Sequence, residues 1–189
     1  MTTTEVTIHR SRRSLGLGGA SLIGAAVSIS LGVYGRVHDA TGQAIVTFGF
    51  PRVLPMKAWL ATGAFVLALV QLYSALRMWD RIHFPRNKPK WLHTAHRWTG
   101  TVAFVLTLPV AYHCLWSLGF QTVGTRQIVH SILGCAFYGA FATKMLALHS
   151  RRVPKWGIPL LGGLVVTLLT ALWLTSSLWF FRNVGFPGL

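Results

Sequence analysis

The sequence is poor in charged residues and above all in acidic ones. Of its 189 residues only 11% are charged, about half the share that is usual in soluble domains. Only three are acidic, namely Glu5, Asp39 and Asp80, and all three lie outside the long apolar runs. No carboxylate is therefore expected inside a membrane span, which disfavours ion transport through buried acids and acid–base catalysis by paired carboxylates.

Motifs built on cysteine or on glycine-rich loops are also missing. Cys114 and Cys135 form no Cys-x-x-Cys pair and show no zinc-finger spacing to histidine, so iron–sulfur and structural zinc sites have no support. The two cysteines fall at different depths in two predicted helices, which favours packing roles over a disulfide. The absence of a phosphate loop and of a Gly-x-Ser-x-Gly motif excludes further enzyme classes.

What the sequence does have is long uncharged runs. Hydrophobic residues make up 52% of the chain, and five stretches approach or exceed the ~20 residues that cross a bilayer. The predicted helices cover residues 14–35, 57–79, 93–118, 126–149 and 156–181. We therefore predict an all-α, polytopic membrane bundle of five transmembrane helices in the cell membrane, with a transmembrane domain over 14–181, a basic tail at 1–13 and a short tail at 182–189.

The basic residues predict the orientation of this bundle. Eighteen Lys and Arg residues give a formal net charge of +15. Most of them fall on one predicted side: Arg10, Arg12, Arg13, Arg77, Arg81, Arg86, Lys88, Lys90, Arg97, Lys144, Arg151, Arg152 and Lys155. The others are Arg36, Arg52, Lys57, Arg126 and Arg182. The positive-inside rule then places the N-terminus in the cytoplasm and the C-terminus outside, and the charge indicates contact with anionic lipid rather than with nucleic acid.

Three local features add to this topology. Small residues recur every four positions in the first helix, at Ala20, Gly24, Ser28 and Gly32, so another helix can approach closely, either inside the bundle or in a homo-oligomer. The external connection over residues 36–56, which carries His38 beside Asp39, is long enough to fold over the bundle. Pro109 lacks an amide donor and predicts a kink in the third helix.

The interior of the predicted bundle contains histidine. At 1.5 Å per residue, His113 and His130 lie about 7 and 6 Å below the external ends of the third and fourth helices, so they are level with each other. His96 and His149 are similarly level on the cytoplasmic side. Ionisable groups inside a membrane are costly, so matched pairs indicate a function. Two facing imidazoles favour axial ligation of haem b.

Four residues near these histidines also suit a haem: Gly100, Gly134, Arg97 and Arg126. Each glycine follows a histidine by one turn and leaves a flat face for a porphyrin. The arginines can pair with propionates. We expect one haem at the external pair and a second only if the cytoplasmic pair does not simply reach the interface. Hydrogen bonding between helices is the alternative for both pairs.

Two resemblances bear on these motifs. The segment from His96 to His113, which opens with HRWTG, and the HSILG start of the fourth helix resemble the haem-binding helices of transmembrane b-type cytochromes, the cytochrome b561 and ferric-reductase-like groups. This resemblance implies haem b and electron transfer. Over residues 15–182, including LGVYGRVHDATG and LTALWLTSSLWFF, the chain is similar to a family of small actinobacterial five-span membrane proteins of uncharacterised function.

The sequence thus favours a b-type cytochrome that transfers electrons at or across the membrane, as a membrane oxidoreductase or electron-transfer subunit if it is an enzyme. The expected partner is an external iron–sulfur or copper protein, or quinol. A cofactor-free anchor or assembly subunit explains the same helices. A transporter for a small molecule is a second alternative.

Overall fold

The computed structural model describes residues 16–84 and 86–185, and over these residues it contains helices and no strand. In chain order the helices are α1 (Leu17–Val37), α2 (Val53–Met78), α3 (Leu92–Tyr112), the π-helix η1 (His113–Leu118), α4 (Thr125–Leu148), α5 (Gly157–Trp173), the π-helix η2 (Leu174–Leu178) and α6 (Trp179–Asn183). The basic tail predicted at 1–13 lies outside the described residues, as do residues 14 and 15 of the first predicted helix.

Five helical segments are long and apolar enough to cross a membrane. They are Leu17–Val37, Val53–Met78, Leu92–Leu118, Thr125–Leu148 and Gly157–Asn183. The predicted all-α membrane bundle is confirmed, with helix ends that shift by a few residues. The second helix begins at Val53 rather than at Lys57, because Pro55 falls in its first turn, where a missing amide needs no helical partner.

The outer surface of the bundle suits contact with lipid. Large apolar side chains are exposed on several helices, for example Leu22 on α1, Val66 on α2 and Leu160 on α5. In a soluble protein such a surface would promote aggregation. The chain is therefore a multi-pass membrane protein.

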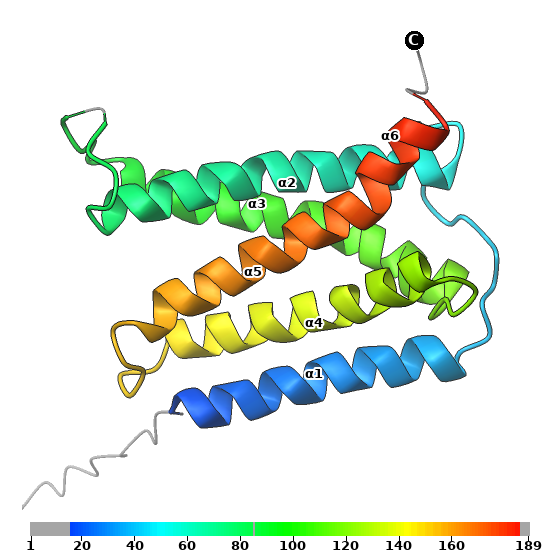
Figure 1. The fold of residues 1–189 in the computed structure, drawn as a ribbon, viewed down its shortest axis with the longest axis horizontal. Coiled ribbons are helices and arrows are strands. Elements are labelled where there is room, and N and C mark those ends of the chain that lie inside the picture. The colour runs from blue at the N-terminus through cyan, green and yellow to red at the C-terminus, as the bar shows by residue number, and fades with distance from the viewer. Residues whose placement is uncertain (1–15, 85, 186–189) are drawn as a thin grey trace, which may run out of the picture.

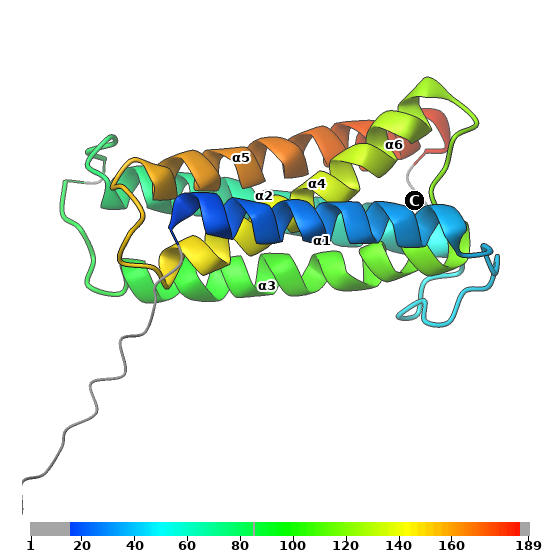
Figure 2. The same ribbon diagram turned by 90° about the horizontal axis from the view of Figure 1, so that it is seen from below.

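The helices run side by side along the long axis of the molecule (Figure 1). Helix α1 packs on α4, α4 on α5, α5 on α2 and α2 on α3, and η1 returns to α1. Figure 2 shows α1 in front of α4, with α3 and α5 on opposite sides. Helices α3 and α4 follow each other in the chain, but they meet through long side chains rather than by close approach of their backbones. Phe104 of α3 stacks on Phe141 of α4, with ring centroids 4.0 Å apart.

The small-residue stripe of α1 packs against α4. Gly24 and Gly139 come so close that a Cβ on either would collide with the backbone carbonyl of the other. The Ser28 hydroxyl donates a hydrogen bond of 2.9 Å to the Cys135 carbonyl. The stripe Ala20, Gly24, Ser28 and Gly32 thus packs inside the chain against α4, which is the first of the two alternatives that the sequence left open.

The third membrane span departs from regular α-helix beyond Pro109, close to the predicted kink. The last six residues of this span, His113–Leu118, form the π-helix η1. Proline cannot donate the backbone bond of an α-helix, and such irregular turns often mark functional sites. η1 ends at Gly119, whose φ of 67° lies in the left-handed region that favours glycine.

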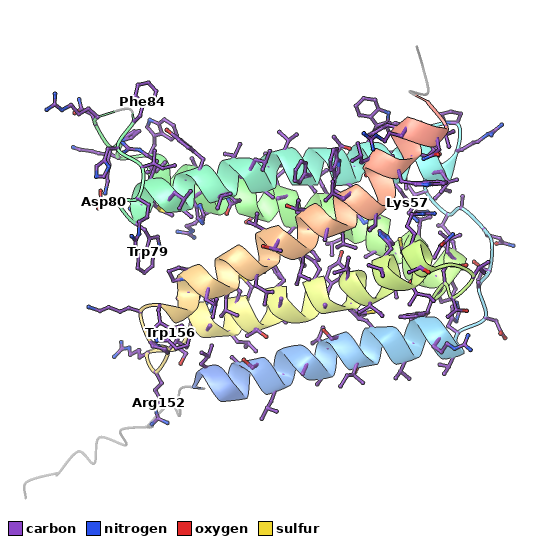
Figure 3. All side chains as sticks on the ribbon, in the orientation of Figure 1. Lys57, Trp79, Asp80, Phe84, Arg152 and Trp156 are labelled. Atoms are coloured by element: carbon purple, nitrogen blue, oxygen red, sulfur yellow. The ribbon has the colours of Figure 1, made fainter. Side chains whose placement is uncertain are left out.

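The connection between α1 and α2 folds over η1, as predicted for the external loop. The amide of Thr41 donates to the Trp116 carbonyl at 3.3 Å, and the amide of Gly42 donates to the Ser117 carbonyl at 3.0 Å. The Ser117 hydroxyl in turn donates to the Gln43 carbonyl at 2.7 Å. Figure 3 labels Lys57 at this end of the bundle and Asp80 at the other. We call them the Lys57 end and the Asp80 end.

Candidate functional site

A cavity of about 360 Å³ lies inside the bundle at the Lys57 end. Its size falls within the ~300–1,000 Å³ of small-molecule sites. Residues of all five spans line it, most of them apolar. Its polar lining side chains are Lys57, Thr107, Cys114, Gln121, Arg126, Gln127, His130, Ser131, Cys135, Tyr138, Ser176 and Ser177. The fold therefore provides a largely apolar site with a few polar groups.

His130 is the histidine of this cavity, and its ring orientation is set by α5 and η2. Its Nδ1 lies 3.0 Å from the Thr175 hydroxyl oxygen. Because that hydroxyl already donates to the Ala171 carbonyl at 2.8 Å, it accepts from the imidazole. The proton is therefore on Nδ1, and Nε2 keeps its lone pair. A histidine held through one nitrogen in this way is typical of a metal ligand.

Cys114 of η1 lines the same cavity as His130. Lys57 lines it as well. Three separate spans supply these groups: Lys57 comes from α2, Cys114 from η1 and His130 from α4. Sequence reasoning assigned Cys114 to packing and missed this cluster, because no motif joins the three residues. Both cysteines are free, as predicted.

Two further polar residues, Ser177 and Arg126, belong to the lining of the cavity. The Ser177 side chain is fully buried, and its hydroxyl oxygen has no hydrogen-bond partner. The Arg126 guanidinium donates to the Thr175 carbonyl at 2.7 Å and lies 3.9 Å from the centroid of the Trp179 ring. Arg126 and Lys57 therefore give the cavity its positive charge, whereas the Ser177 oxygen is enclosed within the cavity wall.

Gly134 keeps the wall beside His130 flat. It lines the cavity, and the nearest atom to an added Cβ is a methyl carbon of Leu172 at 4.0 Å. Of the predicted external group, His130, Gly134 and Arg126 thus come together at one cavity.

His113, the predicted partner of His130, is not among the residues that line this cavity. Its side chain is only 1% exposed. Its Nδ1 donates to the Pro109 carbonyl at 2.8 Å, while Nε2 is buried without a partner. The ring packs edge-on against Tyr112, which stacks in turn on Trp116. The structure therefore places His113 and His130 near the same end of the bundle but not in the same cavity.

A second buried histidine nitrogen lies in the same aromatic cluster. His38 stacks between Tyr34 and Trp116, with ring centroids 5.0 and 4.5 Å away. Its Nε2 is buried without a hydrogen-bond partner. The loop residue His38 thus packs against η1 as part of the cover formed by the α1–α2 connection.

The histidines at the Asp80 end are arranged differently. His96 Nδ1 lies 2.7 Å from the Ser74 hydroxyl. The glycine one turn further on, Gly100, is covered by the Gln71 side chain, whose oxygen would lie 2.9 Å from an added Cβ. His149 is exposed, and its Nδ1 donates to the Met145 carbonyl at 2.8 Å.

The side chain of Gln71 therefore fills the face next to His96. The pocket that includes Gly100 measures about 60 Å³. Arg97 is exposed. Among the described residues, no three His, Cys, Asp or Glu side chains gather into a metal-binding group.

Comparisons with known proteins place the chain in a family without assigning it an activity. The chain matches none of the curated proteins and none of the solved structures with which it was compared. Residues 17–188, which include all five membrane spans, match a family of unknown function, DUF6529, and the chain belongs to this family.

Proposed function

We propose that this membrane protein binds one haem b in the cavity at the Lys57 end and takes part in electron transfer, with His130 as a ligand of the haem iron. The observation that carries the proposal is the hydrogen bond that orients the His130 ring. Its Nδ1 proton is held by Thr175, so its Nε2 lone pair is available inside a cavity within a membrane span.

The other residues of the cavity suit the same group. Apolar walls exclude water from a macrocycle, and Gly134 leaves room beside His130. Arg126 and Lys57 supply positive charge for two propionates. The second axial ligand predicted from the sequence is His113, which lies outside the cavity lining.

A second haem at the Asp80 end receives no comparable support. Its predicted ligands are His96, which is already paired with Ser74, and His149, which is exposed. The glycine face expected to take the porphyrin is covered by Gln71. We therefore propose a single haem.

Bound haem supplies one-electron chemistry. The chain's own contribution is to hold and tune that group. Thr175 fixes the ring orientation of His130 by accepting a hydrogen bond from Nδ1. The Arg126 charge is itself fixed by the Thr175 carbonyl and the Trp179 ring, so it favours an anionic group at the rim of the cavity.

The orientation predicted from charge gives this site a partner. With the N-terminus in the cytoplasm, the Lys57 end faces outward. The site would then exchange electrons with an external iron–sulfur or copper protein, or with quinol in the outer leaflet of the cell membrane. Fusions of alkaline phosphatase and of green fluorescent protein to the C-terminus test this. Phosphatase activity without fluorescence is expected, and the reverse pattern would contradict the orientation.

The haem proposal is tested by pigment analysis of the full-length protein purified from haem-replete cells. A pyridine haemochrome measurement should give about one haem per chain. His130→Ala should lose most of it, whereas His149→Ala, which changes an exposed histidine at the other end, should not. Folded but colourless wild-type protein would refute the proposal.

A small-molecule transporter is the second candidate, and the apolar walls of the cavity favour it. The same preparation separates the two functions. Wild-type protein without haem that still takes up a lipophilic ligand, and does so equally well after His130→Ala, would favour transport. A cofactor-free anchor would show neither property.

A further inference from the structure

We infer that the connection between α1 and α2 is an interfacial anchor, which inserts the side chains of Ile45, Val46 and Phe48 into the lipid surface beside the bundle. These three residues, here called the apolar tip, lie outside any helix. Their side chains are nevertheless 57%, 45% and 61% exposed. Exposed apolar side chains that lie together mark a surface that contacts a protein or a membrane.

The backbone of the tip is strained at its aromatic residue. The amide of Phe50 donates to the Thr47 carbonyl at 2.9 Å and closes a turn whose central residues are Phe48 and Gly49. Both central residues have positive φ, 49° for Phe48 and 82° for Gly49. Such turns favour asparagine and glycine, and a bulky residue at positive φ is an outlier. Strain of this kind is found at functional sites, so we assign the exposed Phe48 side chain to a contact outside the chain.

The fold holds the connection at the depth of the membrane surface. The amides of Thr41 and Gly42 donate to the carbonyls of Trp116 and Ser117, which lie in the last turn of the membrane span Leu92–Leu118. Figure 2 shows the connection, in light blue and cyan, protruding sideways past the end of this span. The space beside the end of a membrane bundle is occupied by lipid headgroups. The connection therefore lies over lipid, and the tip can reach the boundary of the acyl chains.

The residues around the tip suit a bilayer that contains anionic lipid. Trp59 and Trp179, at the same end of the bundle, are partly exposed, as is typical of aromatic side chains at the membrane–water interface. Arg52 is exposed and follows the tip by four residues. Cationic side chains at this depth attract anionic headgroups. Apolar side chains next to basic ones are characteristic of segments that lie in the interface.

The anchor connects the wall of the cavity to the membrane surface. Leu115 and Leu118 of the third span line the cavity, and the anchored connection is hydrogen-bonded to Trp116 and Ser117 between them. Insertion of the tip does not depend on the molecule that the cavity binds, so its test is independent of the haem proposal.

The experiment uses the full chain in vesicles of phosphatidylcholine and phosphatidylglycerol. Cys114→Ala and Cys135→Ala remove the native thiols, so that a single introduced cysteine carries a bimane label. Phe48→Cys and Ile45→Cys place the label in the tip. Asp39→Cys is the control, because it labels the same connection at an exposed acidic residue that should face water.

Two quenchers then distinguish lipid from water. Brominated acyl chains should quench the label at both tip positions, and aqueous iodide should not, whereas the label at position 39 should show the reverse. Iodide quenching at both tip positions equal to that at position 39 would overturn the inference and leave the tip as a surface for a soluble protein. Size-exclusion profiles identify variants that do not fold, and Ile45→Cys decides if Phe48→Cys is among them.

The role of charge is tested by Arg52→Gln combined with Phe48→Cys. Quenching by brominated chains should fall in vesicles with phosphatidylglycerol, because the attraction to anionic headgroups is lost. It should stay unchanged in pure phosphatidylcholine, where Arg52 has no such partner. Equal quenching with and without Arg52 in both kinds of vesicle would contradict the preference for anionic lipid.

Discussion

Replacement of Gly24 by alanine tests the packing on which the position of α4, and with it His130, depends. A Cβ on Gly24 would meet the Thr143 hydroxyl and the Gly139 carbonyl at separations that real side chains essentially never show. Thr143 can rotate, but the carbonyl moves only with the backbone of α4. The added methyl group therefore forces α1 and α4 apart.

The expected cost follows from the kind of contact. Overpacking of a closely packed interface costs about 1–3 kcal/mol. Alanine also gains up to about 1 kcal/mol of helix propensity over glycine, and Gly18→Ala controls for this gain. Gly18 lies on the same helix, and nothing is within 4 Å of an added Cβ there. Gly24→Ala should thus be about 1–3 kcal/mol less stable than Gly18→Ala.

Equilibrium unfolding in detergent, followed by far-ultraviolet circular dichroism, measures this difference. The double variant Gly24→Ala with Thr143→Ala separates the two obstacles. Because the Gly139 carbonyl remains, this variant should stay less stable than Thr143→Ala alone. If Gly24→Ala unfolds together with Gly18→Ala, α1 and α4 do not approach as closely as described, and the reasoning fails.

Three further predictions concern groups elsewhere in the bundle. Arg77 is 2% exposed and donates hydrogen bonds to two carbonyls of the loop that follows α2, at 2.8 and 3.2 Å. Arg77→Met should therefore make this loop more sensitive to limited proteolysis. Unchanged cleavage would contradict a role of Arg77 in ordering the loop. The pKa of Asp80 is lowered chiefly by its hydrogen bond with Lys88. A carboxyl whose pKa is lower in the folded than in the unfolded state stabilises the fold at pH values above its unfolded-state pKa. This stabilisation is lost as the pH falls through the folded-state pKa. Lys88→Ala should therefore lower the unfolding midpoint at neutral pH but match wild type in acid, and a difference that persists in acid would exclude this ion pair as its cause. Tyr138→Phe removes hydrogen bonds of 3.0 Å to the carbonyl and hydroxyl of Thr107. The free energy of unfolding should fall by about 0.6 kcal/mol, which is typical of such bonds between membrane helices. A variant as stable as wild type in detergent unfolding would show that these bonds make no net contribution to stability.

The sequence alone determined the membrane spans, because a bilayer core requires about 20 apolar residues whatever their partners. It also identified the face of α1 that packs closely, since small residues every four positions line one side of a helix. The depth of a residue follows from counting along the helix axis. Such counting places His113 and His130 towards the same end of the bundle.

Only the tertiary structure decided which helix covers each face and which side chain enters the cavity. Periodicity reveals that Gly24 lies on a packing face but not that the partner is Gly139 of α4, since that choice is made between distant segments. The direction in which a side chain points depends on helical phase, and the phase changes where the π-helix η1 follows Pro109. This explains why Cys114, rather than its neighbour His113, lines the cavity together with His130: the depth of the two residues is almost the same, but only the folded helix determines which one faces the cavity.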